Sequence, residues 1–309
     1  MTSLQNTDDD DEFWSVAMNG GDAHYLLPQD DEDDFDVTSC EIIERTITTL
    51  PPDTSSDSRP LVLRLGQNNK DGCLSDVSGD IWDASLLLAS FLYGTNEGRQ
   101  LCYEACFGTD PAEVDGGGII ELGSGLGLSG MAAAAAAAAA LNTKDEQLTS
   151  RVVLTDLDDK DILSLLSKNV QSNLSEIGGC ATFSVTVQPC DWFNVSKSRV
   201  NADDNSQPRG PTGTFNLIVG SALIYISEHA VACAETVYHY LSGSESSQAV
   251  IIQLPDRAGF EQFLHHCREL NMLVSSRAIS EDIIMGAERR IVSADDYRIY
   301  FIKKPRNAC

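Results

Sequence analysis

The chain has 309 residues, of which 42% are hydrophobic, and a formal net charge of −26. Its length suits one large domain or two small ones, and 14 of its 47 acidic residues lie within residues 1–44, which contain no Lys or Arg. Because nucleic-acid binding needs clusters of basic side chains that neutralise phosphates, this composition excludes nucleic acid as a partner and favours basic protein segments, unless the acidic segment serves only solubility.

The N-terminal region divides into a tail and the beginning of a folded domain. Residues 1–38 contain two blocks of like charge that cannot collapse into a core, which predicts an acidic disordered tail. The folded domain is then expected to span residues 39–309. Its first segments, Cys40–Leu50 and Leu61–Leu65, are rich in β-branched and aliphatic residues and are predicted to pair as a hairpin.

Helical periodicity begins at Ile81, because apolar residues from Trp82 to Tyr93 recur every three or four positions. Gly94–Gly98 is predicted to end this helix, and Leu101–Phe107 to form a second short one. Strands then alternate with helices. The predicted strands are Ile119–Leu122, Arg151–Thr155, Ala181–Val187, Phe215–Val219 and Ala249–Leu254, and the predicted helices are Leu126–Leu141, Lys160–Leu174, Glu228–Leu241 and Arg257–Leu270.

This alternation predicts an α/β fold with a parallel, doubly wound sheet and helices on both faces. Two late strands, Met272–Ile279 and Tyr297–Ile302, have little helix between them and predict an antiparallel C-terminal edge. The polar stretch Asn194–Thr214 contains Pro, Gly and Ser and is predicted to be a long surface loop.

Targeting and cysteine patterns indicate a reducing compartment. The N-terminus lacks the basic and apolar regions of a secretory signal, and the longest apolar run, Met131–Leu141, is too short to span a bilayer. Nine scattered cysteines, an odd number, argue against a disulfide framework. We therefore expect a protein of the cytoplasm or the nucleus with no membrane contact, and we expect it to be a monomer.

Three features follow strand ends, where a parallel sheet binds its ligands. The segment Glu121–Gly127 joins a strand to a helix, so that its glycines permit close backbone approach and the helix offers free N–H groups. Asp156 follows the next strand, where a carboxylate can bind both ribose hydroxyls. Asp191 and Trp192 follow the third strand, where an indole can lie against a purine. These features predict S-adenosylmethionine as the ligand.

The same glycines leave a dinucleotide or a purely structural turn as alternatives. Gly125–Gly130 matches the dinucleotide fingerprint, but that fingerprint should begin at the strand end, and here the strand ends at Leu122. Glu121, placed just ahead of Gly123, favours a positively charged cofactor over a pyrophosphate. Asp156 suits either ligand, so the position of the glycines decides in favour of the methyl donor.

Taken in order, these segments resemble the Rossmann-like, seven-strand methyltransferases of family 16, which includes many non-SET protein lysine methyltransferases. The resemblance covers about residues 40–304. It rests on Gly79–Ala84, Ile120–Gly127, Val153–Asp158 with Asn169, Cys190–Trp192 and Phe215–Tyr225. It implies a class I methyltransferase fold, with a seven-stranded, mostly parallel sheet, and S-adenosylmethionine as cofactor.

The features at the strand ends and the resemblance together assign the candidate site. The candidate cofactor-binding residues are Trp82, Glu121, Gly123, Ser124, Gly125, Gly127, Asp156, Asp191, Trp192 and Ser221. By the resemblance, the glycine loop would wrap the cofactor, Asp156 would hold its ribose, and Trp192 would flank its adenine. Tyr225 is the candidate catalytic residue. Both tryptophans also fit an apolar core, and Asp158 is an alternative ribose ligand.

One position departs from the family pattern. The family usually ends its fourth strand with Asp-x-x-Tyr, in which the Asp helps to orient the accepting amine, and here Ala222 stands three residues before Tyr225. Alanine can neither accept a hydrogen bond nor carry charge, which weakens the assignment of lysine as acceptor. Methyl transfer depends mainly on positioning, so the loss of one acid need not abolish it.

Three functions are consistent with these residues. The favoured hypothesis is a protein N-methyltransferase with lysine as acceptor and a basic protein as substrate. The alternatives are a small-molecule N-methyltransferase and an interaction module whose activity is weakened at Ala222. No metal site is expected, because Cys102 and Cys106 lack further ligands and the neighbours in His265–Cys267 point to different helix faces.

Overall fold

The chain divides into two units, Met1–Phe35 and Asp36–Cys309. The computed structural model describes only parts of the second unit, namely residues 41–47, 60–67, 80–108, 117–139, 150–177, 183–200, 210–287, 291 and 294–305. The predicted acidic tail, residues 1–38, therefore lies outside the described residues.

A seven-stranded sheet forms the centre of the second unit. Its strands are β3 (Ile119–Leu122), β4 (Ser150–Asp156), β5 (Phe183–Pro189), β6 (Leu217–Ser221), β7 (Gln248–Gln253), β8 (Leu273–Ala278) and β9 (Arg298–Lys303), in the spatial order β5-β4-β3-β6-β7-β9-β8. The first five strands in this order are parallel, whereas β9 pairs antiparallel with both β7 and β8. The predicted α/β sheet with an antiparallel C-terminal edge is confirmed.

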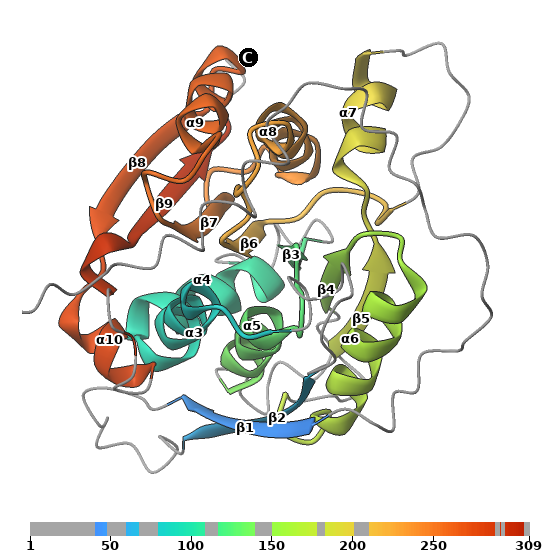
Figure 1. Ribbon diagram of the computed structural model, residues 1–309, viewed down its shortest axis with the longest axis vertical. Coiled ribbons are helices and arrows are strands. Elements are labelled where there is room, and N and C mark those ends of the chain that lie inside the picture. Colours follow the sequence, from blue (N-terminus) through green and yellow to red (C-terminus); the bar gives the residue numbers. More distant parts are fainter. Residues whose placement is uncertain are drawn as a thin grey trace, which may run out of the picture. The chain divides into compact units, whose positions relative to one another are not determined.

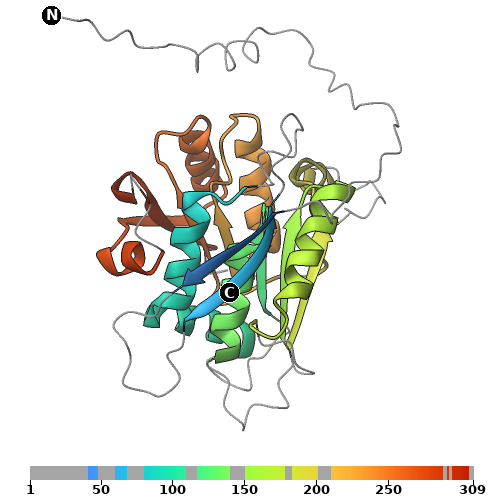
Figure 2. The ribbon, with the colours of Figure 1, turned by 60° about the horizontal axis from the view of Figure 1, so that its bottom comes forward.

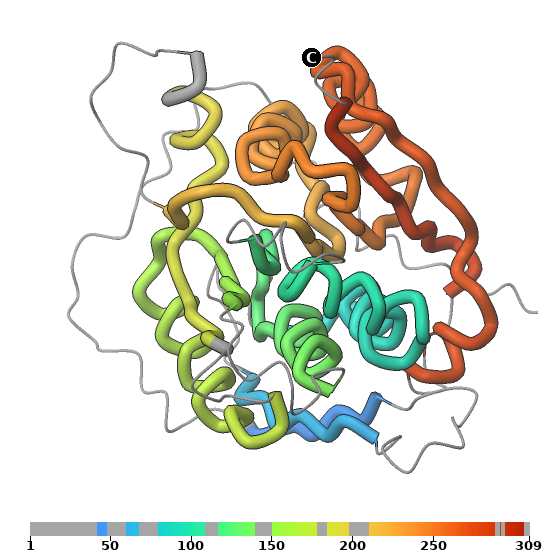
Figure 3. The backbone as a smooth tube through the Cα atoms, turned by 180° about the vertical axis from the view of Figure 1, so that it is seen from behind, coloured from blue at the N-terminus to red at the C-terminus, as the bar shows by residue number. Residues whose placement is uncertain are grey.

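Helices cover both faces of this sheet (Figure 1). One face carries α3 (Asp83–Ala89), α4 (Asn96–Phe107), α5 (Leu128–Ala139) and α6 (Lys160–Ser172), and the other carries α7 (Trp192–Val200), α8 (His229–Tyr240) and α9 (Phe260–Glu269). Figure 3 shows the two helical layers from behind. Because both faces are covered, β3 and β7 are buried along their whole length. A short helix, α10 (Glu281–Gly286), packs against α3.

The strand order reverses between β3 and β6, which are neighbours in the sheet although two strands separate them in sequence. Such a reversal sends the connections after the two strands to opposite faces, and it opens a crevice at their carboxyl ends. The connection after β3 is the predicted glycine loop, and the connection after β6 contains Ala222 and Tyr225. The fold thus brings both candidate segments to one edge of the sheet.

The predicted N-terminal hairpin is formed by β1 (Glu41–Ile47) and β2 (Leu61–Gln67), which pair antiparallel and pack on α5 and α6 (Figure 2). Asn169 on α6 and Asn173, the residue that caps the C-terminus of this helix, bind the backbone of β2. Asn173 Oδ1 accepts from Arg64 N–H (2.9 Å), and its Nδ2 donates to Arg64 O (2.7 Å). Asn169 Oδ1 accepts from Gly66 N–H (2.7 Å), and its Nδ2 donates to Leu126 O (3.1 Å). Asn169 therefore links the hairpin to the glycine loop.

The prediction of a surface loop over residues 194–214 is partly wrong, because helix α7 continues to Val200. Asp191 caps this helix in the usual way, since its Oδ1 accepts from the N–H of Phe193 (2.8 Å). Residues 201–209 lie outside the described residues. The polar composition of residues 194–200 suggested a loop, although Asp191 ahead of them is a residue type that commonly caps the start of a helix.

The second helix of the domain begins earlier than the sequence predicts. α4 starts at Asn96 rather than at Leu101, because Thr95 Oγ1 accepts from the N–H of Gly98 (3.0 Å) and caps it. Gly98 is buried where a side-chain Cβ would collide with the backbone of Phe91. This glycine therefore allows close packing inside a helix instead of ending one.

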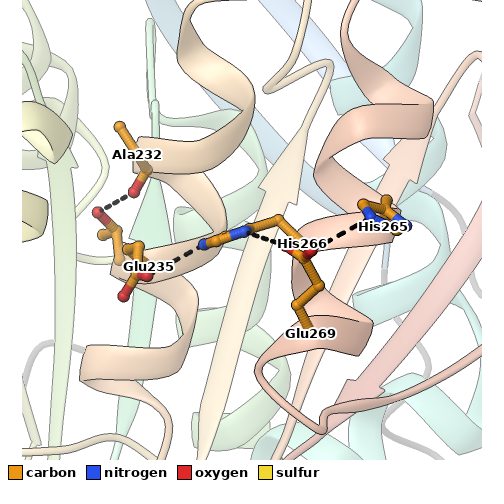
Figure 4. Close-up of polar contacts among 6 residues, drawn as sticks. Ala232, Glu235, His265, His266 and Glu269 are labelled. Carbon is orange, nitrogen blue, oxygen red and sulfur yellow. Dashed lines mark hydrogen bonds and ion pairs between the residues drawn. The ribbon is translucent and has the colours of Figure 1, made fainter.

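A polar contact joins α8 to α9 on the second face (Figure 4). His266 of α9 lies between two carboxylates, with its Nε2 3.0 Å from Oε1 of Glu235 on α8 and its Nδ1 2.8 Å from Oε2 of Glu269 on α9. His265 is exposed and Cys267 is buried in the core. The three neighbours thus point in different directions, as expected for consecutive residues of a helix.

Five cysteines of the described residues are buried free thiols: Cys102, Cys106, Cys190, Cys233 and Cys267. Burial raises the pKa of the Cys106, Cys190 and Cys267 thiols to about 12, so they stay protonated and act as small apolar side chains. Within the part of the chain that the structure describes, no helix combines the length and the apolar character that crossing a membrane requires.

Candidate active site at the carboxyl edge of the sheet

The glycine loop between β3 and α5 turns through three left-handed glycines. Gly123, Gly125 and Gly127 have φ values of 59°, 51° and 86°, a region that side chains with a Cβ rarely adopt. A Cβ on Gly127 would lie 2.6 Å from Leu166 Cδ1 and 2.9 Å from Leu154 Cδ2, so this glycine lets α5 approach the sheet closely. The loop therefore depends on its glycines for both conformation and packing.

Ser124 pins the loop to the neighbouring strand. Its N–H donates to Thr155 O (2.9 Å), and its Oγ accepts from Thr155 N–H (3.0 Å). Thr155 Oγ1 in turn donates to Glu121 O (2.6 Å). The carbonyl of Ser124 also accepts from Gly127 N–H (2.7 Å), so both its side chain and its backbone hold the loop in shape.

Glu121 is buried beneath the start of α5 and is only 1% exposed. A Cβ on Gly130 would collide with its Oε2, so this glycine of α5 makes room for the carboxyl group. Burial raises the pKa of Glu121 to about 8, although Ser124 and the Gly130 N–H approach the carboxyl and partly offset this effect. Oε2 has no contact short and straight enough to be a hydrogen bond. The acid therefore faces the helix instead of the open side of the loop.

Asp156 ends β4 and contacts the glycine loop directly. Its Oδ2 accepts from Gly125 N–H (2.7 Å), and its Oδ1 accepts from Leu157 N–H (2.8 Å). Burial raises the pKa of this carboxyl, while the two backbone bonds lower it. Each carboxylate oxygen has two lone pairs, so each can accept a further bond from a ligand hydroxyl.

Trp192 closes the other side of the loop. A Cβ on Gly123 would lie 3.6 Å from Trp192 Cζ2 and 3.2 Å from Leu223 Cδ2, so the indole and the leucine both lie against this glycine. Asp191, just before it, directs both carboxylate oxygens to residues of the first turn of α7, Phe193 and Asn194. Its cap holds the start of α7, and with it Trp192, beside the glycine loop.

The connection after β6 is held in an unusual conformation. Ser221 is the last residue of the strand, and Ala222 after it has a left-handed φ of 49°. Ala222 N–H donates to Ile252 O (3.0 Å). Buried Gln253 of β7 donates from Nε2 to Ile224 O (2.8 Å) and accepts from Ile224 N–H (3.3 Å). These bonds fix the backbone on which Tyr225 is carried.

Tyr225 and Trp192 meet at a common neighbour, His229. The imidazole ring centroid lies 5.6 Å from that of Tyr225 and 6.0 Å from that of Trp192, in both cases with nearly perpendicular ring planes. Phe193 is a third ring, at 5.6 Å. Tyr225 is 38% exposed and Phe193 is 40% exposed, so this aromatic group lies partly open at the sheet edge.

Trp82 lies just before α3 and is 42% exposed. Its carbonyl accepts from Ser85 N–H (2.9 Å), and the carbonyl of Ser85 accepts in turn from Ser129 Oγ (3.3 Å) at the start of α5. The start of α3 is therefore adjacent to the helix that follows the glycine loop. Such exposure does not fit a core tryptophan.

The structure thus brings Gly125 into contact with Asp156 and Gly123 into contact with Trp192. Ser221 ends the neighbouring strand β6, and Tyr225 lies on the connection that follows it. Glu121 lies beneath the helix. Sequence reasoning did not identify Gln253 or the aromatic surroundings of His229, because Gln253 bonds to a residue 29 positions away and two of the three rings around His229 come from the distant helix α7. It noted Asn169 as part of a motif without predicting that it binds β2.

A family model described as lysine methyltransferase matches residues 61–269, which is more than half of the chain and includes β2 to α9. The chain belongs to the lysine methyltransferase family. The resemblance seen in the sequence motifs is therefore confirmed, and the glycine loop, Asp156, Trp192 and Tyr225 all lie within the matched region.

A curated relative, a calmodulin-lysine N-methyltransferase from Arabidopsis thaliana, is 25% identical over 164 residues, which are 53% of this chain and 46% of the relative. The match thus spans less than half of the relative's length. Solved structures that resemble the fold include the mitomycin 7-O-methyltransferase MmcR (11% identity, 75% of this chain, 56% of that chain, TM-score 0.42). Another is an O-methyltransferase-like protein from Nostoc punctiforme (8%, 70%, 60%, TM-score 0.39).

Family and fold imply S-adenosylmethionine as the cofactor of this lysine methyltransferase family member, and the residues at the sheet edge fit it. The left-handed glycines form a cradle free of side chains, in which a Cβ on Gly123 would lie 3.2 Å from Leu223 Cδ2. Asp156 has spare acceptor capacity at the loop, and the indole of Trp192 offers an apolar surface beside Gly123. A polar, cationic nucleoside compound needs these three kinds of contact.

Proposed function

We propose that this methyltransferase N-methylates a lysine side chain of a protein substrate. The observation that carries the proposal is the lysine methyltransferase match over residues 61–269 around a glycine loop that contacts Asp156 and Trp192. The curated relative, whose name specifies a lysine of a protein, supports the same class of substrate. An acidic chain with a net charge of −26 further favours a substrate with basic character.

The proposed cofactor site uses the residues at the carboxyl edge of the sheet. Backbone groups of Gly123, Ser124, Gly125 and Gly127 would approach the cofactor, Asp156 would accept from its ribose hydroxyls, and Trp192 would lie against its adenine. Trp82, Asp191 and Ser221 would complete the walls. Glu121 would contribute indirectly, because its buried carboxyl group packs under the start of α5, the helix that follows the glycine loop. When bound, S-adenosylmethionine supplies an activated methyl group.

On the acceptor side, the chain contributes positioning. An amine reacts when its lone pair is aligned with the methyl carbon, and walls that hold this geometry account for most of the acceleration of such a displacement. Tyr225 stands on a backbone that Gln253 fixes, 38% exposed at the sheet edge. We assign it to the wall that orients the acceptor.

Transfer of an isotopically labelled methyl group from S-adenosylmethionine to a cell lysate tests the proposal. The matched control is Gly125→Arg, because a side chain at this left-handed position strains the loop and fills the cradle. We expect a labelled protein band with the wild-type protein and none with the control, and mass spectrometry should locate the label on a lysine.

Other outcomes would redirect the assignment. Label confined to low-mass compounds would indicate a small-molecule N-methyltransferase. Complete absence of label, with S-adenosylmethionine still bound in a titration, would indicate an interaction module that has lost catalysis. Label on a protein residue other than lysine would support a protein methyltransferase but would show that its acceptor residue is not lysine.

The substitution Ala222→Asp tests the departure from the family pattern. Aspartate tolerates the left-handed φ of 49° at this position better than alanine does, so the variant should fold. A carboxylate beside the acceptor would bind its ammonium group, and we expect lysine methylation to rise by about 10-fold, the effect of one charge-assisted hydrogen bond. Ala222→Asn is the neutral control of similar size. An unchanged rate in both variants would show that Ala222 does not limit transfer.

A further inference from the structure

His229 occupies the centre of an aromatic group at the site. It is the first residue of α8, and its ring is surrounded by Trp192 at 6.0 Å, Phe193 at 5.6 Å and Tyr225 at 5.6 Å between centroids. The interplanar angles are 88°, 73° and 82°, so each neighbouring ring stands nearly perpendicular to the imidazole. Two of these residues belong to α7 and one to the connection after β6.

The imidazole has an unused polar atom. Nδ1 of His229 is buried and has no hydrogen-bond partner among the described residues. A buried polar atom without a partner destabilises the folded state, and native proteins keep few of them. The ring as a whole is only partly buried, so the rest of it is accessible although Nδ1 is not.

The surroundings favour the neutral form of this ring. Burial lowers the pKa of His229, against the opposing effect of the neighbouring Glu228 carboxylate. The positive end of the α8 dipole also disfavours a cation at the first residue of the helix. A neutral imidazole has one nitrogen with a free lone pair, which can accept a hydrogen bond.

The location of the ring connects it to both halves of the site. Trp192 contacts both His229 and Gly123 of the glycine loop. Tyr225, which also contacts His229, belongs to the connection that begins with Ala222. A group held by the imidazole would therefore lie close to both segments.

We propose that His229 binds the primary amine of the acceptor, as a hydrogen-bond acceptor within the ring group of Trp192, Phe193 and Tyr225. This inference rests on the proposed function, because it names the residue that receives the lysine side chain. An alkylammonium or an amine donates N–H to the imidazole lone pair, while the aromatic rings attract its positive charge and pack on its methylene groups. The bond restricts the rotation of the amine without any covalent or proton-transfer step at His229.

An amine titration tests binding without any need for turnover. The probe is n-butylamine, which has the end of a lysine side chain, added to full-length protein with labelled histidines in the presence of S-adenosylhomocysteine. The loss of a resonance in His229→Phe identifies the imidazole signal of His229. We expect n-butylamine to shift this signal saturably and to leave the signal of exposed His239 unchanged. The absence of a saturable shift would overturn the inference.

Kinetic variants test the same residue during methyl transfer, with the lysine acceptor that the labelling experiment identifies. His229→Phe keeps an aromatic ring but removes both nitrogens, and we expect the KM for the acceptor to rise by about 10-fold, equivalent to about 1.4 kcal/mol. The affinity for S-adenosylhomocysteine should remain unchanged. His229→Gln keeps a hydrogen-bond acceptor and should recover most of the loss. His239→Phe, the same substitution at the other end of α8, is the control and should behave as wild type.

The outcomes separate this inference from the proposed function. Normal acceptor KM in His229→Phe, or weakened cofactor binding in that variant, would overturn the inference while lysine methylation stands. A saturable amine shift in a protein that labels no lysine would support the amine site and reject the proposed function. If His229→Gln does not return the KM for the acceptor towards the wild-type value, the ring only packs against its neighbours and the inference is overturned.

Discussion

Glu121 shows how a single residue can belong to a ligand motif and yet face the protein interior. From the sequence, an acid directly ahead of the first glycine fits a contact with a cationic cofactor. In the structure the carboxyl lies under α5, with its Oε2 against Gly130 and without a hydrogen bond. Burial disfavours the charged form, and this raises the pKa to about 8. The amount by which the buried Glu121 carboxyl group destabilises the folded protein should therefore depend on pH.

We expect Glu121→Gln to stabilise the protein at alkaline pH. The folded-state pKa of about 8 exceeds the ordinary value of 4.5, so the stability associated with the protonated group is fully present below about 4.5 and is lost as pH rises towards 8. The difference in unfolding free energy between the variant and wild type should grow by about 1.4 kcal/mol per pH unit from about pH 4.5 to about pH 8, and then stay constant.

Urea unfolding at several pH values measures this difference. Glu261→Gln is the matched control, because its side chain is exposed on α9 and the same substitution there should produce no such slope. A difference between Glu121→Gln and wild type that does not change with pH would mean that the folded protein holds Glu121 as a carboxylate.

At the scale of elements, α6 organises the site from outside it. Asn169 uses its amide to join three segments, since it bonds to the N–H and C=O of Gly66 in β2 and to Leu126 O after the glycine loop. It is 1% exposed. The amide replaces a strand partner that β2 lacks on this side, and thereby fixes the hairpin and the loop relative to the same helix.

We expect Asn169→Ala to lower the free energy of unfolding by about 3 kcal/mol, because it leaves a buried N–H and a buried carbonyl without their partners. The same variant should bind S-adenosylhomocysteine more weakly, since the backbone of Leu126 loses its support. Urea denaturation and a binding titration measure the two effects. Gln171→Ala, an exposed position on the same helix, should change neither. Unchanged ligand affinity in a destabilised Asn169→Ala would restrict the residue to the hairpin.

At the scale of the whole molecule, charge repulsion opposes folding. Outside residues 1–44 acidic residues still outnumber Lys and Arg by 33 to 21. Net charge far from zero destabilises a compact chain through self-repulsion, and dissolved salt screens this repulsion.

We therefore expect salt to stabilise the protein. Raising NaCl from about 0.01 M to about 0.15 M shortens the screening length from about 30 Å to about 8 Å, and the thermal unfolding midpoint should rise by about 2 to 4 °C. The effect should be smaller at about pH 4, where about half of the carboxyl groups are protonated. A midpoint that falls with added salt would mean that attractive ion pairs dominate the electrostatics of the folded state.

Several features followed from local sequence because their causes are local. The alternation of strands and helices, the glycine loop and the β1–β2 hairpin depend on periodicity, on β-branched residues and on residues that permit a left-handed backbone. The predicted mostly parallel sheet with its antiparallel C-terminal edge is confirmed, although the order that places β9 between β7 and β8 was not predicted. The start of α4 was missed because its first turn is polar, and the extent of α7 was missed because the helix is mostly polar after Phe193.

The sequence by itself determined the class of fold, the family and the position of the glycine loop, since each is encoded in neighbouring residues or in motifs with a set order. Only the tertiary structure decided that Glu121 faces α5, that Gln253 fixes the Ile224 backbone and that His229 lies among three aromatic rings. These facts depend on which strands become neighbours and on which side of each strand a residue points. Contacts of that kind join distant parts of the chain and leave no periodic signal along it.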